Sequence, residues 1–197
     1  MRAETGDDSP QIGGVLLAAG ESNRFGQRNK LLAAIDESPI VREAAKNLRA
    51  STVDSVVAIL GHEAESVREA LEGLQIGFRT NEAYAEGQST SVVEGIAAAR
   101  NRQWDAVVFA LGDMPFVATS SVDAVIDAYI AGAGTVVAPT YRGKRGNPVL
   151  FDQTHYRALA TVTGDRGGRE LVRSMGTEIA VDDPGVRQDI DKPDDLD

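Results

Sequence analysis

The fold is decided by the stretch Ile12-Gly13-Gly14-Val15-Leu16-Leu17-Ala18-Ala19-Gly20. Residues Ile12–Ala18 form a continuous apolar run, rich in branched side chains and bounded by glycine, which predicts a buried strand. Similar runs alternate with helical segments of about 10–14 residues along the rest of the chain. The alternation predicts βαβ crossovers, and therefore a mostly parallel sheet with helices on both faces.

The remaining elements follow from the same apolar patterns. Strands are predicted at 55–60, 76–80, 106–111, 135–139 and 148–151, with an edge strand at 177–181. Helices are predicted at 39–50, 63–72, 89–100, 120–131, 153–160 and 166–175, and Ser38 is expected to cap the first, with Pro39 at its first position. We predict an α/β fold: a single three-layer α/β/α domain over 12–197 with a Rossmann-like sheet, preceded by a flexible tail at 1–11.

The composition excludes several classes of protein. The chain of 197 residues has 30 acidic and 20 basic residues and no Lys/Arg-rich stretch, so we expect no nucleic-acid partner and read the acidic excess as a solvated surface. Cysteine is absent and only His62 and His155 are present, which argues against disulfides, thiolate sites and a histidine zinc site. Without a membrane-length apolar run or a secretion signal, the protein is expected to be cytoplasmic and to have no membrane partner.

A loop with the chemistry of a triphosphate site follows the first strand. It reads Leu17-Ala18-Ala19-Gly20-Glu21-Ser22-Asn23-Arg24-Phe25-Gly26-Gln27-Arg28-Asn29-Lys30. Small residues at Ala18, Ala19 and Gly20 let the backbone approach a ligand, and their N–H groups can form an anion-binding nest. Arg24 and Lys30 add fixed positive charge. The loop lacks both the P-loop and the dinucleotide-binding glycine patterns, and alone it is equally consistent with an ordinary βα turn.

A carboxylate follows the predicted strand at 106–111, within Gly112-Asp113-Met114-Pro115. Asp113 should therefore lie at the carboxyl edge of the sheet, where ligands of such folds collect, beside the glycine loop. Mg²⁺ prefers oxygen ligands and takes one or two protein carboxylates together with waters and substrate phosphates. Asp113 is thus a candidate magnesium ligand, and the alternative is that it only caps the following turn.

The glycine loop resembles the signature L-A-A-G-x-S-x-R-x-G-x-x-K of the nucleotidyltransferases that handle molybdenum cofactor, methylerythritol and sugar phosphates. It is one residue longer between Gly26 and Lys30, so either Arg28 or Lys30 can face the phosphates, and the Lys30-Leu31-Leu32 context favours Lys30. The resemblance implies a sheet of the nucleotide-diphospho-sugar transferase type. It implies that the catalytic residues are Arg24, Lys30 and Asp113. It implies that the nucleotide is bound in this loop by Leu17, Ala18, Ala19, Gly20, Ser22 and Lys30.

The C-terminal Asp189-Ile190-Asp191-Lys192-Pro193-Asp194-Asp195-Leu196 resembles the D-I-D-T-P-E-D-L ending of the same family. The resemblance implies that one of its first two acids is a second metal ligand beside Asp113. Asp191 is preferred and Asp189 is the alternative, because strand-like alternation places both side chains on the same face. Asp194, Asp195 and Asp197 are interpreted as solvated charges.

The middle of the chain resembles the family's substrate-binding motifs. Asn81 and Gly87-Gln88-Ser89-Thr90-Ser91 precede a predicted helix, whose N-terminus carries partial positive charge. The family binds its nucleotide there, which implies roles for Asn81, Gly87 and Ser91, and the alternative is helix capping by Ser89 or Ser91. Residues 143–149 resemble the R-G-x-P-V loop that faces the acceptor, and residues 164–169 resemble the G-D-x-G-x-R segment after it. The implied acceptor-binding residues, each of which could instead be an ordinary surface residue, are Arg145, Asn147, Arg166 and Arg169.

Taken together, the motifs look most like those of the molybdenum cofactor cytidylyltransferases of the MobA-like NTP transferase family. The guanylyltransferase branch typically has L-A-G-G where this chain has Ala19, and the larger residue favours a pyrimidine base. Asn147 takes the position where the cytidylyltransferases often have histidine.

The resemblance implies transfer of CMP from CTP to the phosphate of molybdopterin, with Mg²⁺ as cofactor and a molybdenum hydroxylase as a further partner. The attacking oxygen is already anionic, so no general base is expected. The alternatives are GTP as donor, giving molybdopterin guanine dinucleotide, a sugar or polyol phosphate as acceptor, and a carrier of the finished cofactor.

Overall fold

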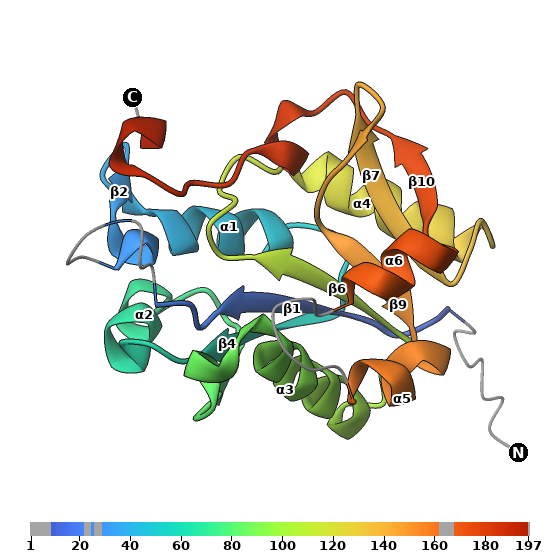
Figure 1. The fold of residues 1–197 in the computed structure, drawn as a ribbon, viewed down its shortest axis with the longest axis horizontal. Coiled ribbons are helices and arrows are strands. Elements are labelled where there is room, and N and C mark those ends of the chain that lie inside the picture. The colour runs from blue at the N-terminus through green and yellow to red at the C-terminus, as the bar shows by residue number, and fades with distance from the viewer. Residues whose placement is uncertain (1–8, 22–24, 26–28, 162–167, 197) are drawn as a thin grey trace, which may run out of the picture.

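The computed structural model describes residues 9–21, 25, 29–161 and 168–196, and its centre is a twisted sheet (Figure 1). Neighbouring strands follow the order β10-β7-β9-β6-β1-β4-β5, and β8 pairs with β7. The pairs β1/β4, β1/β6, β4/β5 and β7/β10 are parallel, whereas β9 is antiparallel to both β6 and β7. The strands are β1 Ile12–Ala18, β4 Ser55–Leu60, β5 Gly77–Thr80, β6 Ala106–Leu111, β7 Val136–Tyr141, β8 Lys144–Arg145, β9 Val149–Asp152 and β10 Thr177–Ala180.

Helices cover both faces of the sheet, which confirms the predicted three-layer α/β/α architecture. The helices are α1 Ile40–Arg49, α2 Ala64–Ala70, α3 Gln88–Asn101, α4 Thr119–Ile130, α5 Tyr156–Leu159 and α6 Arg169–Met175. One apolar core joins the sheet to α1, α2 and α4, and a second joins it to α3, α5 and α6. Figure 1 shows α1 and α4 on one side of β1 and β6, with α3 and α5 on the other.

The alternation of side chains along β1 assigns its residues to these two cores. Leu16 packs in the core with α1, whereas Val15 packs in the core with α3, and both are fully buried. Gly13 lies on the α3 side, directly beneath the buried indole of Trp104, and an added Cβ there would lie 2.0 Å from the ring. The glycine therefore makes room for the largest side chain of that core.

The predicted strands and helices are present, with small differences at their ends, and one local prediction is wrong. Ser38 does not cap the first helix, and Pro39 is not its first residue. Ser38–Pro39 forms strand β3, which pairs antiparallel with β2 Ala34–Ile35, and α1 begins at Ile40. Asp36 and Glu37 make the tight turn of this hairpin with φ angles of 48° and 71°. The fixed φ of proline suits an extended residue as well as a helical one, so Pro39 alone did not distinguish them.

The first eight residues of the predicted flexible tail lie outside the described residues. Gln11, the last residue of the predicted tail, is bound to Asp105 by two hydrogen bonds. The Gln11 N–H donates to the Asp105 carboxylate at 2.9 Å, and the Gln11 carbonyl accepts from the Asp105 N–H at 2.8 Å. In the part of the chain that the structure describes, no helix combines the length and the apolar character needed to cross a bilayer.

We predict that Gly13→Ala lowers the free energy of unfolding by about 1–3 kcal/mol, because the new methyl group overlaps Trp104 in a packed core. Denaturant unfolding followed by circular dichroism measures the change. Gly20→Ala is the matched control, since a Cβ at Gly20 meets no atom of the described residues within 4 Å and should change stability by less than about 0.5 kcal/mol. Equal effects of the two substitutions would contradict the packing argument.

Candidate active site

A cavity of about 450 Å³ lies at the carboxyl edge of the sheet, where β1 and β6 end. Its walls come from the loop after β1, the loop after β6, the start of α3 and the C-terminal segment. This is the edge at which ligands bind in open parallel sheets. The lining residues are Leu17, Ala19, Gly20, Glu21, Lys30, Leu31, Tyr84, Ala85, Gly87, Gln88, Ser91, Leu111, Asp113 and Asp191.

Most of the residues predicted to bind nucleotide line this cavity. Leu17, Ala19, Gly20, Lys30, Gly87 and Ser91 are among its lining residues. Ala18 is buried in the core beneath it. Ser22 and Arg24 lie outside the described residues, so their predicted roles stay predictions.

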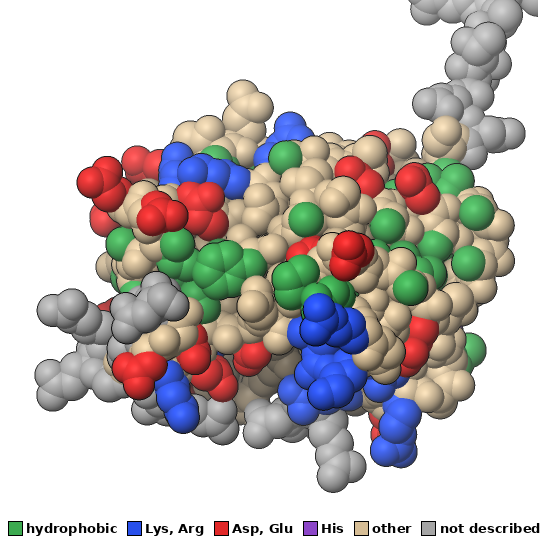
Figure 2. All heavy atoms as spheres, turned by 90° about the horizontal axis from the view of Figure 1, so that it is seen from above, with side chains coloured by type: hydrophobic (Ala, Val, Ile, Leu, Met, Phe, Trp, Pro, Cys, Tyr) green, Lys and Arg blue, Asp and Glu red, His purple; other side chains and the backbone are tan. Residues whose placement is uncertain are grey.

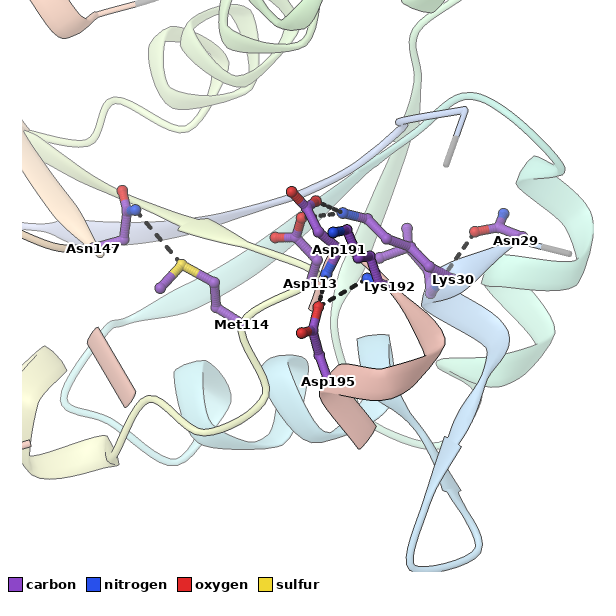
Figure 3. A network of polar contacts seen from close by, with 9 residues as sticks. Asn29, Lys30, Asp113, Met114, Asn147, Asp191, Lys192 and Asp195 are labelled. Carbon is purple, nitrogen blue, oxygen red and sulfur yellow. Dashed lines mark hydrogen bonds and ion pairs between the residues drawn. The ribbon is translucent and has the colours of Figure 1, made fainter. Parts of the chain in front are cut away.

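Lys30 links the two carboxylates of the cavity. Its Nζ donates to Asp113 Oδ2 at 2.6 Å and to Asp191 Oδ1 at 3.1 Å (Figure 3). Burial lowers the pKa of Lys30, but the charges and hydrogen bonds of Asp113 and Asp191 outweigh burial, so the pKa is raised above its usual 10.5. Lys30 is therefore a fixed positive charge, and the structure brings together three residues predicted from distant motifs.

The backbone around Lys30 is held by its neighbours. Lys30–Leu32 forms a short 3-10 turn, and the Asn29 side chain accepts a hydrogen bond from the Leu31 N–H at 3.1 Å. The Leu31 side chain is buried in the core. The position of the Lys30 backbone is thus set by local structure, and its long side chain projects into the cavity.

The C-terminal segment is attached to the loop after β6. The Ile190 side chain is buried, and its N–H donates to the Asp113 carbonyl at 2.9 Å. Asp195 Oδ2 accepts from the N–H groups of Asp191 and Lys192 at 2.9 and 2.8 Å. These hydrogen bonds lower the pKa of Asp195. The carboxylate is exposed, as expected of a solvated charge, and it also holds two backbone N–H groups.

The structure also separates the two candidate acids of this segment. Asp191 lines the cavity and contacts Lys30, whereas Asp189 is exposed and lines neither this cavity nor its neighbour. The expectation that both side chains share a face rested on strand-like alternation. The segment is not a strand, and the two acids are distinguished by their contacts and exposure instead.

Asn81 lies behind the cavity wall. Its side chain is buried, and its Nδ2 donates to Thr90 Oγ1 at 2.8 Å and to Ser91 Oγ at 2.9 Å, while its Oδ1 accepts from the Ala83 N–H at 3.0 Å. Asn81 thus ties the turn after β5 to the first turn of α3. Gly87 occupies the N-cap position of α3 with φ 117°, and no side chain caps the helix. The alternative that Ser89 or Ser91 caps α3 is therefore wrong.

A second cavity, of about 630 Å³, adjoins the first. Leu17, Gln88 and Leu111 line both. The second cavity has an apolar floor and an arginine rim. The floor is formed by Val92, Phe109, Val149, Phe151, Leu159 and Val172, and the rim carries Arg145, Arg169 and Arg173 together with one acid, Glu170.

Of the predicted acceptor-binding residues, Arg145 and Arg169 line the second cavity. Asn147 also lines the second cavity, and Arg145 Nη1 is held by the Val172 carbonyl at 3.0 Å. Arg166 lies outside the described residues. Sequence reasoning missed Arg173, although its spacing of four residues from Arg169 places both on one face of α6. Figure 2 shows a group of basic side chains below the centre of the face, with further basic side chains elsewhere on it, although the chain carries a net charge of −10.

The residues of the first cavity fit a magnesium ion that is shared with a substrate. Among the described residues there is no cluster of three Asp, Glu, His or Cys that could hold a metal alone. Asp113 and Asp191, however, direct one oxygen each toward a single cation, the Lys30 ammonium group. Two carboxylates completed by phosphates and water form a typical Mg²⁺ environment.

Comparison with known proteins assigns the family. The model of the MobA-like NTP transferase domain matches residues 14–179. The chain belongs to the MobA-like NTP transferase family. The loop after β1, Asp113, the start of α3 and the loop around Arg145 all lie within the matched range, whereas Asp191 lies beyond it. The case for Asp191 therefore rests on its contact with Lys30 and on the D-I-D resemblance.

Relatives of this MobA-like protein carry different names. It is 29% identical to nicotine blue oxidoreductase of Paenarthrobacter nicotinovorans, over 93% of this chain and 94% of that protein. It is 26% identical to the purine catabolism protein PucB of Bacillus subtilis, over 96% of each. A crystal structure of Rv0371c of Mycobacterium tuberculosis in complex with manganese is 30% identical and has a TM-score of 0.79, covering 94% of this chain and 95% of that one.

We predict that Asp195→Ala loosens the segment that carries Asp191, because the N–H groups of Asp191 and Lys192 lose their acceptor. Hydrogen exchange measured by mass spectrometry should be faster over residues 190–192. In the unsubstituted protein, the protection should be present above pH 3.8 and should be lost as the pH falls through the lowered pKa of Asp195.

Asp194→Ala is the matched control for this prediction. Asp194 is exposed, and it has no hydrogen bond or ion pair with the described part of the chain. Its removal should leave exchange over residues 190–192 unchanged. Equal acceleration by the two substitutions would contradict a positioning role for Asp195.

Proposed function

We propose that this MobA-like protein transfers CMP from CTP to the phosphate of molybdopterin and releases pyrophosphate. The observation that carries the proposal is the pair of adjoining cavities that share Leu17, Gln88 and Leu111. We name them the donor cavity, which contains Lys30, Asp113 and Asp191, and the acceptor cavity, which has the arginine rim. A transferase for two large substrates needs two such sites that meet at the reacting atoms.

In the donor cavity, the chain would bind the triphosphate through backbone and cationic groups. Gly20 lines the cavity, and Gly87 is the N-cap of α3, a helix of fourteen residues whose positive N-terminal end favours anions. Lys30 would balance charge on the phosphates. Asp113 and Asp191 would hold Mg²⁺, which when bound would neutralise charge on the triphosphate and on the leaving pyrophosphate.

In the acceptor cavity, the apolar floor and the arginine rim suit a flat ring system that carries a phosphate. Phe109 and Phe151 pack edge to face with ring centroids 6.1 Å apart, giving the floor aromatic surface. Arg145, Arg169 and Arg173 can bind a phosphate with charge-assisted hydrogen bonds. The acceptor phosphate brings its own anionic oxygen, so the protein needs to position it and does not need a general base.

The preference for CTP rests on Ala19, which lines the donor cavity. Its Cβ also restricts the space beside Gly61, where an added Cβ would lie 2.7 Å from that of Ala19. A methyl group at this wall leaves less room for a base than glycine does, which favours a pyrimidine over a purine. GTP as donor, and a sugar or polyol phosphate as acceptor, use the same chemistry and remain the alternatives.

Pyrophosphate release tests the reaction and its substrates together. We predict that CTP with molybdopterin gives the fastest release among the four ribonucleoside triphosphates, each tested with molybdopterin and with sugar and polyol phosphates. Faster release with GTP would replace the proposed donor, and faster release with a sugar phosphate would replace the acceptor.

Stoichiometric binding of finished cofactor without any turnover would instead favour a carrier. Oxidation or reduction of a substrate without pyrophosphate release would favour an oxidoreductase, the class of enzyme for which the Paenarthrobacter relative is named.

We predict that Lys30→Ala and Asp113→Asn each lower the rate of pyrophosphate release by about 10²–10³, because each removes a charge that acts on the triphosphate. Lys192→Ala is the control, since the Lys192 side chain is exposed in the same segment and the hydrogen bond from Lys192 to Asp195 uses only the backbone N–H. Asp191→Asn should slow the reaction at least about 10-fold more than Asp189→Asn. Near-normal rates for Lys30→Ala and Asp113→Asn would refute the mechanism.

We predict that Arg173→Ala raises the KM for the acceptor about 10-fold or more and leaves the KM for CTP nearly unchanged, because a charge-assisted hydrogen bond is lost in the acceptor cavity alone. Steady-state kinetics with each substrate varied in turn measures the two constants. Arg157→Ala is the control, since Arg157 is exposed on α5 and lines neither cavity. A raised KM for CTP alone would contradict the assignment of the two cavities.

A further inference from the structure

Lys30 occupies the point at which the two proposed metal ligands converge. Its ammonium nitrogen lies 2.6 Å from Asp113 Oδ2 and 3.1 Å from Asp191 Oδ1. Dashed lines in Figure 3 mark the two contacts. The side chains of Lys30 and Asp113 are only 15% and 21% exposed, so water competes weakly for the pair. In this structure the ammonium group is the counter-ion of both carboxylates.

A divalent cation that binds these two oxygens on the side where Lys30 lies competes with the ammonium group for the same position. Mg²⁺ binds carboxylate oxygens at about 2.0–2.1 Å. An ion at that distance from Asp113 Oδ2 and Asp191 Oδ1, on the side that faces Lys30, would lie against the Lys30 nitrogen, where two like charges repel. Binding of the ion in that position requires that the ammonium group move away.

The local structure allows the side chain of Lys30 to move while its backbone stays in place. The backbone is fixed by the 3-10 turn, the Asn29 cap and the buried Leu31 side chain. The flexible four-carbon stem carries the charge into the donor cavity, whose wall also includes Gly20 and Gly87. Phosphate oxygens bound there would offer the ammonium group new acceptors.

We propose that Lys30 is an internal competitor for the metal site: the entering cation displaces it from Asp113 and Asp191, and it then binds the triphosphate. The proposal rests on the proposed function of the donor cavity and explains how its two ligands enter. If the metal ion bound alone, the displaced Lys30 ammonium group would lose its two carboxylate partners. If the nucleotide bound alone, its negatively charged phosphates would face the two carboxylates. Each ligand therefore strengthens the binding of the other, by the same factor in both directions.

Metal binding without nucleotide tests the competition directly. Mn²⁺ is the probe, because free Mn²⁺ is measured by electron paramagnetic resonance. Lys30→Met keeps the length of the side chain and removes its charge, and we expect it to bind Mn²⁺ about 10-fold more tightly than the unsubstituted protein. Lys192→Met removes one positive charge next to Asp191, but the Lys192 side chain does not occupy the proposed metal site. It should change Mn²⁺ affinity less than about twofold.

The coupling is measured by repeating the titration with a CTP analogue in which a methylene group joins the α and β phosphorus atoms. The analogue should strengthen Mn²⁺ binding by the unsubstituted protein by about 10-fold or more and should strengthen binding by Lys30→Met much less. Circular dichroism checks that the variants are folded, and Lys30→Gln serves as a second uncharged variant.

Unchanged or weaker Mn²⁺ binding by both uncharged variants would overturn the proposal. Equal tightening in Lys30→Met and Lys192→Met would also overturn it, because the effect would then come from net charge. Absence of Mn²⁺ binding in every protein would overturn both the competition and the metal assignment. The expected binding pattern without pyrophosphate release from any nucleotide would leave the competition intact and refute the proposed function.

Discussion

The parallel pairing of β1 with β6 is the constraint on which the rest of the structure depends. Leu17 pairs with Leu111 at the end of the two strands, and the Gly112 N–H donates to the Leu17 carbonyl at 2.9 Å. The two loops that follow therefore leave the sheet at the same level. Lys30 and Asp113 can meet because of this, and the C-terminal segment is then held in place by the Asp113 carbonyl.

Most of the fold could be predicted from apolar patterns, because buried strands and the helices that cover them require long apolar runs. The strands at Ile12–Ala18, Ser55–Leu60 and Ala106–Leu111 have the predicted bounds. The hairpin at Ala34–Ile35 and Ser38–Pro39 could not be predicted in this way. Its strands have only two residues each, and its turn depends on positive φ angles at Asp36 and Glu37, which are uncommon for these residue types.

The candidate site could be predicted where residue type alone specifies the chemistry. Lys30, Asp113 and Asp191 were expected from charge, loop chemistry and resemblance, and the structure brings them together. The sequence could not predict which of Asp191 and Asp189 lies at the cavity, because this depends on the path of a segment without regular structure. For the same reason Asp195 looked like any exposed acid, although its carboxylate holds two backbone N–H groups.

Hydrogen bonding likewise decides the role of Asn81. A polar residue after a strand is equally compatible with a ligand contact and with an internal partner. In the structure, its amide is used by Thr90, Ser91 and Ala83, so it shapes the wall that a ligand would touch. The expectations for Ser22, Arg24 and Arg166 concern residues outside the described part of the chain and stay predictions.

The contact between Trp104 and Gly13 gives the protein a built-in optical reporter. Trp104 is the one tryptophan of the protein and is only 4% exposed. It lies near the amino end of β1, whereas Leu17, which lines both cavities, lies near the carboxyl end of that strand. The emission of a tryptophan depends on its immediate surroundings, and Trp104 lines neither cavity. Its fluorescence should therefore follow the integrity of the core and respond little to the filling of the cavities, so that folding and ligand binding can be observed as separate signals.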